Sequence, residues 1–196
     1  NTRRASVSFN FLREGQSIQT AYHILKRALG SDYQKILAAE KTIPGRLKKI
    51  VDTIEDISGL EHFGAYLTLL FEVDALIANE DRHLNNIAIL EENGKYHYCP
   101  LFDNGEGLML DNVKYPFDVE TRGLMKHLRA KPFQCRFGTI LSAARDLYGA
   151  QLKIVCSAAE VSEIAEKYLD WYQPMFRPFL KERIVDVVLL QMKKYF

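Results

Sequence analysis

The chain has 196 residues, of which 47% are hydrophobic and 26% charged, a balance that predicts one globular domain with a sizeable core. A formal net charge of +1 gives no reason to expect a nucleic-acid partner, and no zinc-finger spacing occurs. No run approaches the ~20 apolar residues of a membrane span. Three cysteines, far apart in the sequence, argue against a disulfide framework. We therefore expect a cytoplasmic protein without membrane or direct nucleic-acid contacts.

The first part of the chain predicts an extended segment followed by three helices. Residues 1–15 alternate loosely between apolar and polar side chains, which is typical of extended backbone. Ser17 is a suitable N-cap for a helix over residues 17–29, where apolar residues recur at helical spacing. Further helices are predicted over residues 32–40 and 44–58.

The longest helical pattern covers residues 60–78 and is apolar enough to be mostly buried. Asp74, one turn before its end, is a polar residue in this apolar helix. A polar stretch without periodicity follows at residues 79–86. A hairpin is then predicted, with strands over residues 87–90 and 96–101, because Asn93-Gly94 is the strongest short hairpin signal.

The remainder of the chain is predicted to be helical after a loop over residues 103–118. The helices are expected near residues 120–129, 137–148, 158–171 and 177–195. Helices dominate, so the fold class is mainly α (α+β), with a small β-hairpin. One domain over residues 1–196 is expected, divided into a catalytic segment (60–110) and a helical remainder (120–196).

Three side chains that carry oxygen flank the predicted hairpin. Asp81 follows a rigid helix, and Asn86 stands just before the first strand of the hairpin. Asp103 follows the second strand, which returns the chain to the end of the hairpin where Asn86 lies. We therefore expect the three side chains to converge in one pocket.

An Asp, an Asn and a second Asp in this order and near-spacing are the groups with which protein kinases assemble a phosphoryl-transfer site. Such a site needs a carboxylate that orients the attacking hydroxyl and accepts its proton, a role that suits Asp81. It also needs oxygen ligands that hold Mg²⁺ against the phosphates of ATP. The amide of Asn86 and the carboxylate of Asp103 are suitable ligands.

Several of these residues have a plainer interpretation. A single Asp or Asn in a polar loop usually forms a turn or caps a helix, so the prediction depends on the combination. His83 is either a general base, a metal ligand or, as we favour, a hydrogen-bonded scaffold of the loop. Arg82 either pairs with a carboxylate or faces solvent. A basic cluster either meets a phosphorylated or acidic partner or, more commonly, is a solvated surface; it comprises Lys126, His127, Arg129, Lys131 and Arg136.

The run Asp81-Arg82-His83-x-x-Asn86, with Pro100-Leu101-Phe102-Asp103 after it, resembles the catalytic loop and metal-binding segment of HipA-like kinases. These are bacterial serine/threonine kinases distantly similar to phosphoinositide kinases. The resemblance covers about residues 60–110. It implies that the chain is a helical kinase C-terminal lobe. Asp81 would be the catalytic base, His83 the loop histidine of the catalytic motif, and Asn86 and Asp103 the ligands of Mg²⁺ and, through it, of ATP.

The resemblance further implies a protein Ser or Thr hydroxyl as the substrate, and some family members are toxins of toxin–antitoxin pairs. No Gly-rich phosphate loop and no strand with a phosphate-binding Lys precede the site. We therefore expect the N-lobe to be absent from this chain or supplied by a separate one, which leaves nucleotide binding weak. Expected partners are a protein substrate and an antitoxin or N-lobe.

Two alternatives remain at this point. One is a non-catalytic, pseudokinase-like module that binds a protein partner. The other is a lipid kinase, which would need a basic, membrane-facing loop after Asp103. Lipid phosphorylation is the least favoured, because Lys114 is the only cation in residues 104–118.

Overall fold

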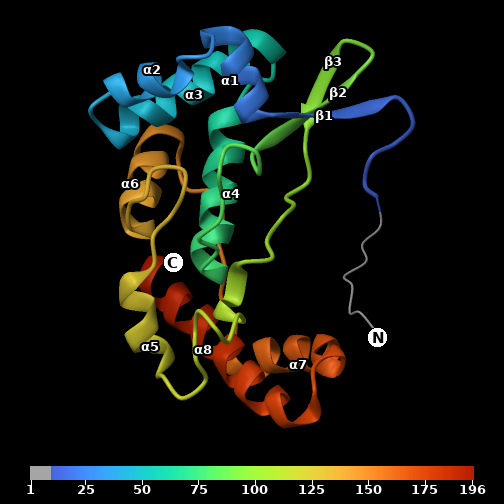
Figure 1. Ribbon diagram of the computed structural model, residues 1–196, viewed down its shortest axis with the longest axis vertical. Coiled ribbons are helices and arrows are strands. Elements are labelled where there is room, and N and C mark those ends of the chain that lie inside the picture. The colour runs from blue at the N-terminus through green and yellow to red at the C-terminus, as the bar shows by residue number, and fades with distance from the viewer. Residues whose placement is uncertain (1–9) are drawn as a thin grey trace.

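The computed structural model, which describes residues 10–196, is mainly helical with one small antiparallel sheet, as the sequence predicts (Figure 1). The first half contains, in order, β1 (Gln16–Thr20), α1 (Ala21–Leu29), α2 (Tyr33–Ala39), α3 (Ile43–Ser58), α4 (Phe63–Ile77), β2 (Ala88–Glu92) and β3 (Lys95–Tyr98). The second half contains η1 (Gly107–Met109), α5 (Thr121–Leu124), η2 (Met125–His127), α6 (Phe137–Tyr148), α7 (Ala158–Tyr168), η3 (Leu169–Trp171), η4 (Pro174–Phe176) and α8 (Arg177–Tyr195).

Helix α4 lies at the centre of the molecule, with α3, α6 and α8 packed around it (Figure 1). Because it has neighbours on several sides, it buries apolar residues around most of its circumference, as the apolar pattern predicts. Its largest buried side chains include Phe63, Leu67, Leu70 and Phe71. This packing fixes the C-terminal end of α4, from which the polar loop 79–86 departs.

The sheet has the order β1-β2-β3, with both pairs of strands antiparallel. The hairpin between β2 and β3 turns at Asn93-Gly94, as predicted. Both residues have positive φ, 52° and 78°, which is the conformation that a tight hairpin turn requires. The register pairs Glu92 with Lys95 directly across the turn. The hairpin thus carries the chain away from the polar loop and back again.

The predicted helix over residues 17–29 is wrong in its first four residues. Residues 16–20 form β1, and Thr20 rather than Ser17 is the N-cap, because its hydroxyl accepts a hydrogen bond from the backbone N–H of His23. Ser17 instead donates its hydroxyl to Glu91 of β2, at 3.1 Å. The reason is tertiary: pairing with β2, 68 to 76 residues away, decides the conformation of this segment.

Some predicted boundaries also change. The helix expected near residues 120–129 is a short α5 followed by η2, and the helix over 158–171 ends as η3. The loop 103–118 contains η1. Of the predicted extended segment, residues 1–9 lie outside the described part of the chain, and residues 10–15 form no strand.

A second, smaller apolar cluster lies between α7 and the first half of α8. It comprises Val161, Ala165, Leu169, Leu180 and Ile184. Helix α8 connects this cluster with the main core, because Val187, one turn further along, is buried in that core. Within residues 10–196, no helix has the length and apolar content that crossing a bilayer requires.

Candidate functional site

The polar loop after α4 is anchored by one buried arginine. The Arg82 side chain is 1% exposed, and its Nε and Nη2 atoms donate to the two carboxylate oxygens of Asp74, each at 2.9 Å. Asn79 donates its Nδ2 to the same carboxylate at 2.7 Å. Burial raises the pKa of Asp74, while Arg82 and Asn79 oppose that rise. Of the two roles left open for Arg82, the structure therefore selects pairing with a carboxylate.

The same guanidinium also joins the loop to the segment that follows β3. Its Nη1 atom donates to the carbonyl oxygens of Asn86, at 2.9 Å, and of Phe102, at 2.6 Å. Its Nη2 atom donates to the side chain of Asn104. Since one nitrogen atom binds both carbonyls, the backbone at Asn86 lies beside the backbone that enters Asp103.

Asp81 lies among polar neighbours at the start of this loop. Its carboxylate forms an ion pair with Lys131, and His83 Nε2 lies 3.8 Å from the second carboxylate oxygen. The side-chain amide of Asn86 donates to the backbone carbonyl of Asp81 at 3.2 Å. The structure thus brings Asp81, His83 and Asn86 together within one turn of the loop.

The role of His83 is not decided by its contacts. Its backbone supports the loop, because its N–H donates to Asp81 and its carbonyl accepts from Asn86. Its ring atom Nδ1 is buried and has no hydrogen-bond partner in the described part of the chain. The side-chain hydrogen bond expected of a scaffold residue is therefore not made through this nitrogen.

The two predicted metal ligands have side-chain oxygens that suit Mg²⁺. Asn86 uses its amide nitrogen within the loop, which leaves Oδ1 as a possible ligand. Asp103 is exposed and has a φ of 55°, a left-handed conformation that Asp tolerates better than most residues. Residues 10–196 contain no group of three or more His, Cys, Asp or Glu that could hold a metal. The two-ligand Mg²⁺ site therefore stays a prediction.

A cavity of about 450 Å³ opens beside Asp81. Its walls carry acidic and basic side chains, namely Glu80, Asp81, Glu106, Lys114, Arg129 and Lys131. The volume lies within the usual range for small-ligand sites, and the three cations could meet phosphate groups. Asn86 and Asp103 do not line this cavity, so of the predicted site residues only Asp81 faces it.

Glu80 is a site residue that the sequence analysis missed. It accepts hydrogen bonds from the Tyr115 hydroxyl, from the Arg129 backbone N–H at 2.6 Å and from Lys114 at 2.9 Å. Partial burial acts to raise the pKa of Glu80, but these donors outweigh it and lower the pKa below its ordinary value. Its three partners lie 34 to 49 residues away, so no local sequence signal could have identified them.

Comparisons of the chain with protein-family models, with curated proteins and with solved structures found no match. The chain is therefore described by its own features. It is a mainly α protein, and a buried Arg–Asp pair anchors its polar loop beside a charged cavity. Any function must be inferred from these side chains.

Proposed function

We propose that this chain carries the phosphoryl-transfer site of a HipA-like protein kinase, which transfers the γ-phosphoryl group of ATP to a protein Ser or Thr hydroxyl. Asp81 is the catalytic base in this proposal, and Asn86 and Asp103 hold Mg²⁺. The proposed setting is the cytoplasm. The proposed partners are a protein substrate together with a separate N-lobe or an antitoxin.

The observation that carries the proposal is the double hydrogen bond of Arg82 Nη1. By binding the carbonyls of Asn86 and Phe102, it keeps Asn86 beside the residue that precedes Asp103 although β2 and β3 intervene in the sequence, which supports a shared metal site. In-line phosphoryl transfer depends mainly on such positioning and on cancellation of charge. A buried, bidentate arginine is well suited to hold two backbone segments in a fixed relation.

Lys131 would cancel phosphate charge in this site. Its amino group pairs with Asp81, and both side chains are about one-third exposed at the edge of the cavity. A triphosphate that enters the cavity would compete for this cation, which would release the Asp81 carboxylate to accept a proton from a hydroxyl. Mg²⁺ would be held by Asn86 and Asp103, which lie outside this cavity, and when bound it would neutralise part of the phosphate charge.

Two measurements test the proposal. Calorimetric titration of the full natural chain with ATP, with and without Mg²⁺, measures binding. Transfer of labelled γ-phosphate from ATP to the chain itself and to acceptor proteins measures catalysis. Asp103→Asn should abolish the Mg²⁺-dependent part of ATP binding. Asp81→Asn should retain binding and lower phosphate transfer by about 100-fold or more.

Asp111→Asn is the matched control for both variants. Asp111 is an exposed aspartate in the same segment as Asp103, and it accepts a hydrogen bond from the Val113 N–H that an Asn can also accept. This variant should behave as the wild type. Mg²⁺-dependent ATP binding that survives Asp103→Asn, or transfer that survives Asp81→Asn, would contradict the assigned roles.

The ion pair between Lys131 and Asp81 also supports a second candidate, a pseudokinase-like binding module. In such a module the pair would be a permanent structural contact and no nucleotide would displace it. Lys131→Met separates the two candidates. A kinase should lose affinity for ATP in this variant, whereas a binding module should show no Mg²⁺-dependent ATP binding before or after the change.

A further inference from the structure

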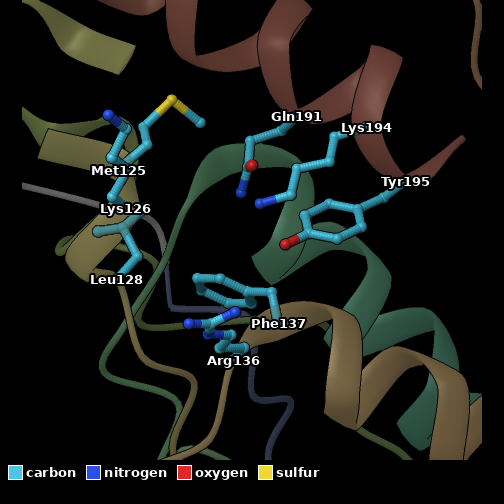
Figure 2. Close-up of a pocket in the computed structure, with 8 residues that line it drawn as sticks. All are labelled: Met125, Lys126, Leu128, Arg136, Phe137, Gln191, Lys194 and Tyr195. Atoms are coloured by element: carbon cyan, nitrogen blue, oxygen red, sulfur yellow. The ribbon is translucent and has the colours of Figure 1, made fainter. Parts of the chain in front are cut away.

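A second cavity, of about 330 Å³, shares no lining residue with the cavity beside Asp81. Its walls come from three places: the end of α8, the start of α6 and the turn η2 (Figure 2). Figure 2 shows the Lys194 amino group, the Tyr195 hydroxyl and the Gln191 amide turned toward the ring of Phe137.

The charged side chains that line this cavity are all cations. They are Lys126, Arg136 and Lys194, and no carboxylate is among the lining residues. Within residues 10–196, none of the three forms an ion pair. An adjoining cavity of about 280 Å³ shares Lys126 and Lys194 and adds Arg122 and Lys193. Because the whole chain has a formal net charge of only +1, this positive face is a local concentration of charge.

The floor of the cavity combines a buried amide with an aromatic ring. Gln191 is 1% exposed and donates Nε2 to the Ala75 carbonyl of α4 at 2.6 Å, so its orientation is fixed by the core. That bond leaves its Oε1 able to accept a hydrogen bond from a ligand. Phe137, the first residue of α6, is also buried and supplies an apolar surface. A ligand that fits these walls has a negative charge, a hydrogen-bond donor and an apolar face.

Charge and size narrow the class of ligand. A phosphomonoester carries a charge of about −1.5 to −2 at neutral pH and accepts several hydrogen bonds, so it can engage two or three cations at once. A monocarboxylate would leave most of that positive charge unmatched. At about 330 Å³ the cavity lies at the lower end of the range for small-ligand sites, which is more room than a bare phosphate ion needs.

We propose that this cavity binds a small phosphomonoester, with its phosphate between Lys194, Arg136 and Lys126 and its organic part against Phe137 and Gln191. The site lies outside the proposed phosphoryl-transfer site and does not depend on it. The stretch from Leu128 to Arg136 contributes residues to both cavities, and through Arg129 and Lys131 it gives a bound ligand a readout at the cavity beside Asp81.

The test is calorimetric titration of the full chain with inorganic phosphate, adenosine 5′-monophosphate and glucose 6-phosphate, and, separately, with a DNA duplex. At least one phosphomonoester should bind at least tenfold more tightly than inorganic phosphate. Lys194→Gln and Arg136→Gln should each weaken that binding by about tenfold or more, because each removes a charge-assisted hydrogen bond. Both side chains are exposed, so neither change should lower the melting temperature appreciably.

Lys153→Gln is the matched control, because Lys153 is an exposed lysine outside both cavities and its loss changes net charge equally. The titrations are made without Mg²⁺, on which nucleotide binding at the proposed kinase site depends, so that a failure of the kinase proposal and a failure of this one are distinguishable. Three results would overturn the proposal: no binding of any phosphomonoester at millimolar concentration, equal affinity for bare phosphate, or binding that survives both cation variants. Binding of the duplex alone would also overturn it and would indicate a general polyanion surface.

Discussion

Arg82 makes the largest set of contacts that hold the candidate site together. It is enclosed by the protein, and its hydrogen bonds reach Asp74 in α4, Asn86 in the loop and Phe102 after β3. A lysine could not replace it, because an ammonium lacks the planar fork of donors that binds a carboxylate and separate carbonyls together. Asp74, a charged residue in an apolar helix, is present because it neutralises this arginine.

Arg82→Met is expected to lower the free energy of unfolding by about 3–5 kcal/mol, because it leaves the Asp74 carboxylate buried without its partner. Adding Asp74→Leu to that variant should restore part of the loss, since the uncompensated charge is then also removed. Urea unfolding of the wild type, both single variants and the double variant measures the coupling between the two residues. Losses that simply add would show that the pair is not coupled.

At the scale of elements, the segment between β3 and α5 is held in place mainly by hydrogen bonds to other parts of the chain. Its one regular element is η1, and Asp103, Leu108 and Met109 all have positive φ. Arg183 of α8 donates to the carbonyls of Tyr115, Pro116 and Val119, at 3.0–3.3 Å. The hydroxyl of the same Tyr115 donates to Glu80, and this contact attaches the segment to the polar loop.

The hydrogen bond between Tyr115 and Glu80 should make the free energy of unfolding depend on pH. The folded protein lowers the pKa of Glu80, so its contribution is present above the ordinary carboxyl value near 4.5 and is lost as the pH falls through the lowered pKa. Glu80→Gln should therefore reduce the free energy of unfolding by about 1 kcal/mol at neutral pH and by less at an acidic pH below 4.5.

Urea unfolding of both proteins at the two pH values measures this difference. Glu163→Gln is the control, because Glu163 forms an exposed pair with Lys167 along α7, and such surface pairs contribute little. A loss for Glu80→Gln that is equally large at both pH values would contradict a role for its charge.

At the scale of the whole molecule, stability depends on how closely the helices approach α4. Gly64 in the first turn of α4 faces the Tyr148 ring of α6, and a Cβ atom built at Gly64 would overlap that ring. The absence of a side chain at residue 64 therefore sets the distance between these helices. The same contact supports the site indirectly, because α4 delivers the polar loop at its other end.

Gly64→Ala should lower the free energy of unfolding by about 1–3 kcal/mol, because the added methyl group overpacks the contact between α4 and α6. Gly123→Ala in α5 is the matched control. No atom lies within 4 Å of a Cβ built there, so that variant should be neutral or slightly more stable. Thermal melts of the two variants give the comparison, and equal melting temperatures would show that Tyr148 moves aside without cost.

Much of the helical architecture could be predicted from local patterns. The apolar periodicity of α4, the Asn93-Gly94 turn and the helix over 137–148 all lie where the sequence places them. The residues 16–20 could not be assigned in this way, because a strand of five residues carries little periodicity and its partner is distant. Local patterns could not reveal the contacts of Glu80, or the contact of Lys131 with Asp81, since each joins residues at least 34 positions apart.

What the sequence by itself determined is the helical character of the chain and the identity of the polar groups around the hairpin, because periodicity and turn chemistry are local properties. Only the tertiary structure decided that Arg82 turns inward to Asp74, that Asn86 and the entry to Asp103 lie side by side, and that cations from η2, from α8 and from the residue before α6 meet around one cavity. These contacts follow from how the helices pack against one another, and helix packing brings together residues whose separation along the chain carries no signal of their proximity.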